Sequence, residues 1–242
     1  MSQETRYAIY LLPSQDSPLA NAGAEWLGWD VFKGAPFAHP DRYQLSAADI
    51  EVLTTSPRHY GFHGTLKAPF RLKEGLGELE IRAAFKDFVR CHSAQSYPDL
   101  EISKLDSFFA LTPKSSGNGL STLAADVVRH FEPLRAPISK REYEKRNPHL
   151  LTDRQQSYLT EWGYPYVFEE FRFHITLSNK IADAYLNSKV AEALNTHFPE
   201  SLLNESDDFC IALCVEENKQ PFKMLASSSV NILLPESMCH VS

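Results

Sequence analysis

The sequence predicts an α+β fold with antiparallel or mixed sheets, built from two related halves. Three observations support this prediction: the composition is that of an ordinary globular chain, segments of strand and helix character are interleaved along it, and one five-residue motif occurs twice. With 242 residues, of which 43% are hydrophobic and 23% charged, the chain can bury a substantial core without the help of disulfides.

Strand character begins near the N-terminus and recurs along the chain. Residues 6–12 are rich in aromatic and branched side chains and end at Pro13, which favours a first strand. Similar patterns predict strands over residues 60–70, 100–104, 108–112, 171–178, 209–215 and 222–233. The polar residues 216–221 separate the last two segments, which indicates a hairpin.

Helix signals lie between these strands. Ser17 and Ser46 each stand where a capping residue is expected, the first before Pro18 and the second three residues before Asp49. The resulting helices run to Trp26 and to a point before Pro57, and further helices are predicted over residues 76–91, 120–131, 152–163 and 182–196. The charge-dense residues 139–147 are interpreted as a solvated surface segment.

Charge and hydropathy limit the partners. The chain has 24 Lys+Arg against 31 Asp+Glu, a formal charge of -7, which argues against binding of nucleic acid or an anionic membrane over the whole surface. The first residues lack a basic segment followed by an apolar run, and no stretch approaches the roughly 18 apolar residues of a membrane span. We therefore expect a cytoplasmic protein without a membrane partner.

The four cysteines are predicted to be structural thiols. Cys91, Cys210, Cys214 and Cys239 are too few and too scattered for a disulfide scaffold, and none has the C-x-x-C spacing of a zinc or redox site. This usage is consistent with a reducing compartment.

The repeated motif reads Phe62-His63-Gly64-Thr65-Leu66 in its first copy and Phe173-His174-Ile175-Thr176-Leu177 in its second. With nine His and ten Thr in 242 residues, chance predicts about 0.4 H-x-T triplets, so one copy alone would carry no information. Two copies within the same Phe and Leu frame indicate two related half-structures that each contribute the same strand.

Alternation along a strand divides each copy into two faces. The polar faces carry His63, Thr65 and Lys67 in the first copy and Arg172, His174 and Thr176 in the second. The opposite faces are apolar and are predicted to face the core, while Gly64 leaves room for a close approach. Each copy therefore presents an imidazole, a hydroxyl and a cation in a row.

Two such rows facing one another suit a phosphate ester. Cleavage of a phosphodiester needs a base at the attacking oxygen and an acid at the leaving oxygen, and two imidazoles, with an ordinary pKa of about 6.5, can divide these roles. The hydroxyls and cations would stabilise charge on the non-bridging oxygens. This scheme needs neither a metal nor another cofactor. A single strand histidine is more often structural, and a two-histidine metal site is the weaker alternative, because neither motif contains a carboxylate or thiolate.

At these residues the sequence resembles the two-histidine phosphoesterase superfamily, whose signature is a pair of H-x-T/S motifs. The flanking residues 57–70 and 162–174, the first strand and the helix start at 151–155 are similar to the branch encoded with phosphonate-utilisation genes. The resemblance covers most of the chain and departs from that branch at Gly64, where an alanine is expected. It implies a single domain, residues 1–242, of two pseudo-symmetric lobes, each an antiparallel sheet flanked by helices, with the active site in the cleft between them.

The resemblance also implies a metal-independent phosphodiesterase. His63 and His174 would form the acid–base pair, and Thr65 and Thr176 would supply phosphate-binding hydroxyls. The implied substrate is a small, cyclic phosphate ester, in keeping with phosphonate metabolism.

Four neighbouring residues are further candidates for substrate binding. We expect Lys67 and Arg172 to act on phosphate charge, because an ammonium or guanidinium is a poor base at neutral pH. Tyr60 and Tyr166 precede the motifs and would line the mouth of the pocket by stacking on a sugar or base.

Two other functions remain open for the sequence alone. A 2',3'-cyclic or 2'-5' phosphodiesterase or ligase of RNA ends would use the same residues, although a charge of -7 disfavours nucleic acid beyond short RNA ends. A non-catalytic phosphate or nucleotide-binding protein would have no need of a titrating pair. We therefore expect a monomeric hydrolase that acts on a small phosphate ester.

Overall fold

The computed structural model describes residues 5–41, 44–92, 99–115, 119–204 and 209–229. The centre of this described part is an antiparallel seven-stranded sheet with the order β5-β6-β7-β4-β1-β8-β9. Its strands are β1 (Thr5–Pro13), β4 (Gly64–Phe70), β5 (Leu100–Leu105), β6 (Phe108–Pro113), β7 (Ile175–Thr176), β8 (Phe209–Glu217) and β9 (Lys223–Ser229). β2 (Trp29–Asp30) and β3 (Ala35–Pro36) form a separate ribbon.

The α+β class is confirmed, but the large sheet is continuous, whereas we expected a separate sheet in each lobe. β4 and β7 each begin directly after one of the two histidines, and they are paired through Gly64 and Ile175 in the middle of the sheet. β7 pairs with β6 on its other side, and β4 pairs with β1. The two motifs therefore meet within one sheet. The two-lobed symmetry and the cleft stay predictions.

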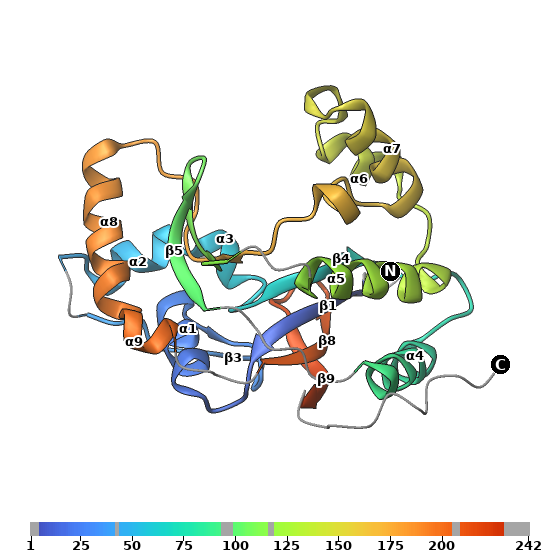
Figure 1. The fold of residues 1–242 in the computed structure, drawn as a ribbon, viewed down its shortest axis with the longest axis horizontal. Helices are drawn as coiled ribbons and strands as arrows, with labels where there is room; N and C mark the ends of the chain where they lie inside the picture. The colour runs from blue at the N-terminus through green and yellow to red at the C-terminus, as the bar shows by residue number, and fades with distance from the viewer. Residues whose placement is uncertain (1–4, 42–43, 93–98, 116–118, 205–208, 230–242) are drawn as a thin grey trace.

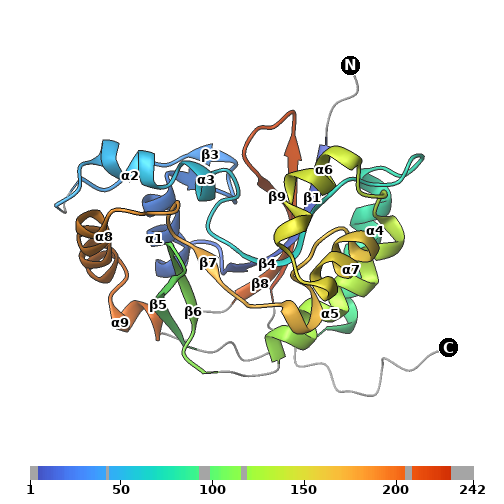
Figure 2. The ribbon, with the colours of Figure 1, turned by 90° about the horizontal axis from the view of Figure 1, so that it is seen from above.

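Helices gather in two groups on either side of the strands (Figures 1 and 2). The group near β5, β6 and β7 contains α1 (Pro18–Leu27), α2 (Ala47–Leu53), α3 (Thr55–Arg58), α8 (Ala184–His197) and α9 (Glu200–Leu203). The other group contains α4 (Glu78–Cys91), α5 (Gly119–Phe131), α6 (Lys140–Lys145) and α7 (Asp153–Trp162). Short 3-10 turns are η1 (Glu132–Leu134), η2 (Pro148–Leu150) and η3 (Phe168–Glu170). None of the described helices combines the length and apolar character needed to cross a bilayer.

Local capping chemistry explains where the predicted helices begin and end. Ser17, Ser46 and Thr152 accept hydrogen bonds from backbone N–H groups in the first turns of α1, α2 and α7. Gly28 and Gly163 follow α1 and α7 in the left-handed conformation, with φ of 74° and 72°. These boundaries lie within two residues of the predicted ones.

The charge-dense segment contains a helix that the sequence analysis did not predict. α6 begins after Ser139, which forms a capping box with Glu142. Glu142 also accepts a hydrogen bond from Arg71 at 2.9 Å. Burial alone would raise the pKa of Glu142, but its bonds from Arg71 and Ser139 lower it to about 2. The S-x-x-E spacing was the signal that would have located this helix.

Alternate residues of β1 enter two different cores. Tyr7, Ile9 and Leu11 belong to a large cluster that also contains buried residues of α1, α4, α5 and α8. Ala8, Tyr10 and Leu12 belong to a smaller cluster with β8, Val31 and Phe222 on the opposite face. β1 is therefore buried on both faces, which explains its nearly uninterrupted apolar sequence.

The second motif forms a shorter strand than predicted. β7 contains only Ile175 and Thr176, because beyond them the Ser178 hydroxyl accepts the hydrogen bond from the Phe109 N–H, at 2.9 Å. The predicted strand over 60–70 begins only at Gly64, since Gly61 turns the chain with a φ of 76°. Residues 230–233 of the last predicted strand lie outside the described residues.

Three of the cysteines can be placed. Cys210 and Cys214 are buried in β8, and Cys91 is exposed. Burial raises the pKa of Cys210 to about 11 and that of Cys214 further, so both remain thiols at neutral pH. Cys239 lies outside the described residues.

Candidate functional site

The two H-x-T motifs lie side by side in the middle of the sheet. Gly64, between His63 and Thr65, is the register partner of Ile175, which stands between His174 and Thr176. Antiparallel pairing at the two central residues therefore brings the histidines and threonines of both motifs to one place.

Gly64 permits this pairing because its missing side chain makes room for the other motif. A Cβ atom at Gly64 would lie 2.2 Å from Cε2 and 2.5 Å from Cζ of Phe173. Phe173 is itself buried, so its ring has little space to move away. The close approach expected at Gly64 is confirmed, and the atom that makes it belongs to the second copy.

Both histidine rings are held in the same way. His63 Nδ1 lies 2.9 Å from the carbonyl oxygen of Gly61, and His174 Nδ1 lies 2.8 Å from that of Arg172. A carbonyl oxygen only accepts, so Nδ1 must donate in each ring, and a neutral ring then has its lone pair on Nε2. The repeat thus extends from sequence to hydrogen bonding, with each ring bonded to the residue two positions earlier.

His63 is buried and neutral at physiological pH. Burial lowers its pKa to about 4, the bond to Gly61 opposes this change, and the nearby charge of His174 lowers the pKa further. His63 Nε2 lies 3.1 Å from the Thr65 hydroxyl, which can donate to it.

His174 is more accessible than its counterpart in the first motif. It is partly exposed, whereas His63 is only 9% exposed; Thr65 and Thr176 are both partly exposed. The His174 ring lies 6.0 Å from that of Phe108, measured between centroids. The site therefore has one buried and one accessible imidazole, which can meet a ligand from solvent at different depths.

Aromatic residues surround His63. The Tyr10 ring lies 3.9 Å from the His63 ring and the Tyr60 ring 6.0 Å from it, both measured between centroids. Tyr60 also stacks on Phe222 at 5.6 Å. Tyr60 thus lies beside His63, and its role in substrate binding stays a prediction. Tyr166 is exposed and packs edge-to-face on Tyr164 at 5.6 Å.

The two candidate cations have protein partners. Lys67 is buried, and its Nζ lies 2.9 Å from a Glu132 carboxylate oxygen and 3.2 Å from the Val128 carbonyl. Burial lowers the pKa of Lys67, against the pull of Glu132. The exposed Arg172 donates to the carbonyl oxygens of Glu169, at 2.8 Å, and Phe171, at 2.7 Å. Their phosphate-binding role stays a prediction.

A buried ionic cluster next to the first motif was missed by the sequence analysis. Glu216, only 2% exposed, accepts hydrogen bonds from Arg6 Nη2 at 2.8 Å and from His59 Nε2 at 2.6 Å. Burial alone would raise the pKa of Glu216, but the bonds from His59 and Arg6 lower it to about 2. His59 precedes the turn that carries His63, so the cluster fixes that turn to β8. No sequence signal joins residues so far apart, and Glu216 was assigned to a polar turn.

The Tyr10 hydroxyl adds an unpaired polar atom to this region. It is buried and has no hydrogen-bond partner among the described residues. Burial raises the pKa of Tyr10, with smaller contributions from Cys214 and Tyr60. No group of three or more His, Cys, Asp or Glu side chains in the described part of the chain has an arrangement that could hold a metal ion.

Two curated proteins with similar sequences are named for an enzymatic reaction. The chain is 37% identical over 196 residues to "Ribose 1,5-bisphosphate phosphokinase PhnN" of Janthinobacterium sp. (strain Marseille), covering 80% of this chain and 43% of that relative. It is 34% identical over 211 residues to the protein of the same name from Laribacter hongkongensis (strain HLHK9), covering 87% of this chain and 48% of that relative. The chain thus spans less than half the length of either relative. No solved structure matches.

These names contradict the activity expected from the sequence. A phosphokinase transfers a phosphoryl group, whereas we predicted hydrolysis of a phosphodiester. The predictions of a hydrolase and a phosphodiesterase are corrected by this finding, and neither the RNA-end enzyme nor the non-catalytic binding protein fits the relatives better. The expected connection with phosphonate metabolism is consistent with the PhnN relatives.

A family match covers β5 to β8, nearly all of β4, and the helices from α4 to α9. The family described as "Protein of unknown function (DUF1045)" matches residues 65–223, from the threonine of the first motif to the start of β9. This is more than half of the 242 residues and includes the whole second motif. The chain belongs to the DUF1045 family.

Proposed function

We propose that this chain binds a phosphorylated ribose at the paired H-x-T motifs and takes part in phosphoryl transfer to it, within phosphonate metabolism. The observation that carries the proposal is the duplicated ring setting, in which both Nδ1 atoms are bonded to backbone carbonyls, so each neutral ring keeps its lone pair on Nε2. The Thr65 hydroxyl, 3.1 Å from His63 Nε2, would turn from that ring to the bound phosphate. The names of the relatives support the substrate class and the reaction class.

His63 is the proton acceptor in this proposal. Its pKa of about 4 keeps the ring neutral at pH 7, so Nε2 can take a proton from a hydroxyl or phosphate oxygen of the bound ribose. His174 would exchange a proton with the same ligand at the more accessible side. Thr65 and Thr176 would donate hydrogen bonds to non-bridging phosphate oxygens, where charge develops during transfer.

The proposal includes descent of the two motifs from the two-histidine phosphoesterase superfamily, with the ligand in a cleft between pseudo-symmetric lobes. It does not include phosphodiester hydrolysis. The chain covers 43% and 48% of the two relatives, so its share in their reaction is part of the proposal and is tested below by transfer to the ribose phosphate.

Calorimetric titration with ribose 1,5-bisphosphate tests the site. We expect His63→Ala and His174→Ala each to weaken binding at least about tenfold, which corresponds to about 1.4 kcal/mol. Thr65→Val and Thr176→Val remove a donor while keeping the shape and should weaken binding less. His149→Ala is the matched control, since His149 is exposed on η2.

Phosphorus-31 NMR with a nucleoside triphosphate then tests the reaction. The expected result is growth of a ribose phosphate signal that depends on His63. Equal ligand affinity in all five variants would contradict the site. Release of inorganic phosphate without transfer would contradict the reaction class.

A further inference from the structure

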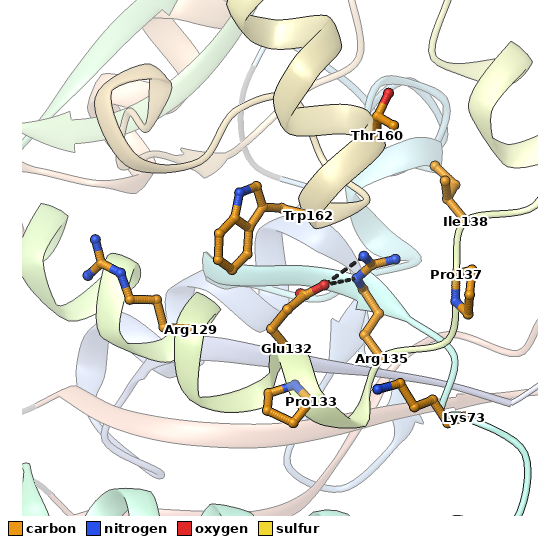
Figure 3. A pocket seen from close by; sticks show the side chains of 9 residues that line it. All are labelled: Lys73, Arg129, Glu132, Pro133, Arg135, Pro137, Ile138, Thr160 and Trp162. Atoms are coloured by element: carbon orange, nitrogen blue, oxygen red, sulfur yellow. Dashed lines mark hydrogen bonds and ion pairs between the residues drawn. The ribbon is translucent and has the colours of Figure 1, made fainter.

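A cavity of about 640 Å³ lies where η1, the following residues and the end of α7 meet (Figure 3). Sites for small molecules typically measure about 300–1,000 Å³. None of the residues named above for the ribose phosphate site lines this cavity. Its lining consists of Lys73, Arg129, Glu132, Pro133, Arg135, Pro137, Ile138, Thr160 and Trp162.

A buried ionic frame fixes one wall of the cavity. Arg135 donates to the Glu132 carboxylate from Nε at 2.8 Å, and to the carbonyl oxygens of Ala136 and Glu161 at 2.9 Å each. The bond to Glu161 fastens η1 to the last turn of α7. These bonds hold the Arg135 side chain in place. Because a guanidinium has five N–H donors, at least one N–H of Arg135 is left for a ligand.

The wall has more positive than negative charge. Glu132 shares its carboxylate between Arg135 and the buried Lys67, so two cations face one anion. Lys73 is exposed and has no carboxylate partner among the described residues. Arg129 lies 3.6 Å from the carboxylate of Asp126. The cavity lining itself has three cations, Lys73, Arg129 and Arg135, and one carboxylate, Glu132, on a chain whose formal charge is -7.

The other wall is a flat aromatic surface. Trp162 ends α7 and is half-buried, and Phe168 holds its indole edge-to-face at 4.9 Å between centroids. Figure 3 shows the indole between Arg129 and the Glu132–Arg135 pair, with the Lys73 ammonium on the side of Arg135. An exposed indole face stacks well on a planar ring.

We propose that this cavity binds a nucleotide, with its base on Trp162 and its phosphates at Lys73 beside Arg135. A nucleotide combines the two features that the walls offer, a polyanion and a planar ring. Its role as the phosphoryl donor rests on the proposed function, whereas the binding itself does not.

Calorimetric titrations with ATP, adenosine and tripolyphosphate separate the two walls. We expect Lys73→Gln to raise the Kd about tenfold for ATP and tripolyphosphate and to leave adenosine unchanged. Trp162→Leu should raise the Kd about tenfold for ATP and adenosine but not for tripolyphosphate. Lys33→Gln is the control for loss of a surface charge, because Lys33 lies in the turn between β2 and β3.

Wild-type affinity for ATP in both variants, or no ATP binding by the wild type at millimolar concentration, would overturn the proposal. Equal affinity for ATP and tripolyphosphate would also overturn it, since the base would then contribute nothing. If Trp162→Leu lowers the melting temperature strongly, Trp162→Phe replaces it. His63→Ala should bind ATP with the affinity of the wild type. The nucleotide site can therefore be tested even if the ribose phosphate site is refuted.

Discussion

The charge state of His63 gives the most direct test of the site. Burial lowers its pKa from 6.5 to about 4 in the folded protein, whereas the unfolded chain binds the proton with an ordinary pKa. Between pH 6.5 and 4 the unfolded state therefore holds a proton that the folded state excludes. The contribution of His63 to stability is fully present above pH 6.5 and is lost as the pH falls through this window.

The size of the effect follows from the shift. A difference of one pKa unit corresponds to about 1.4 kcal/mol, so a shift from 6.5 to about 4 removes about 3 kcal/mol of unfolding free energy by pH 4. Urea denaturation at intervals between pH 7 and pH 4 measures it. His63→Asn is the reference protein, since its amide can keep the bond to Gly61 without titrating, and the difference between the two curves isolates His63.

Other titrating groups are common to both proteins. Burial also lowers the pKa of His39, and the pKa values near 2 of Glu142 and Glu216 place their transitions at lower pH. Stability curves that run parallel for wild type and His63→Asn would refute the reasoning. So would an NMR titration of the His63 ring with a midpoint near 6.5, since burial would then not have lowered its pKa.

Three substitutions test the packing around the site, each measured by urea denaturation. Gly64→Ala places a Cβ 2.2 Å from the Phe173 ring and should destabilise the protein by about 1–3 kcal/mol. The control Gly77→Ala, whose Cβ would have its nearest neighbour at 3.6 Å, should change stability by less than about 1 kcal/mol. Equal effects of the two substitutions would contradict the clash at Gly64. Lys67→Gln leaves a partly buried carboxylate short of one partner and should cost about 2–4 kcal/mol, while an unchanged stability would instead favour a role in ligand binding. Glu216→Gln should cost about 2 kcal/mol and disturb the NMR signals of the turn before His63; unaltered signals would remove its positioning role.

Capping signals predicted most of the helices because their chemistry is local. Ser46 and Thr152 each form a complete box with the residue three positions later, so sequence spacing alone locates the helix start. The same spacing at Ser139 was outweighed by the density of charge around it. Strand lengths were predicted less well, since β7 is limited by a side-chain hydrogen bond from a different element.

The repeat predicted which residues would meet, but not what else lies around them. His63 and His174 come together because two copies of one motif pair at their central residues. Glu216 and Arg6 are 210 residues apart, and only the pairing of β1 with β8 makes them neighbours. Lys67 shares the strand alternation of the motif, yet its long side chain reaches Glu132 beyond α5. The chemistry of the motif fits several phosphate reactions, so the residues alone did not select one of them.

The contact between the motifs also determines how the two parts of the sheet are connected. β4 and β7 share a single register pair, so the ladder that connects the two parts of the sheet is as narrow as a ladder can be. Backbone pairing at this point is minimal, so the buried Phe173 ring, which occupies the space beside Gly64, is a main packing contact between the two motifs. A ligand bound by both imidazoles would bridge β4 and β7 at this register pair. The spacing of the two motifs and the connection between the two parts of the sheet are therefore set at the same register pair.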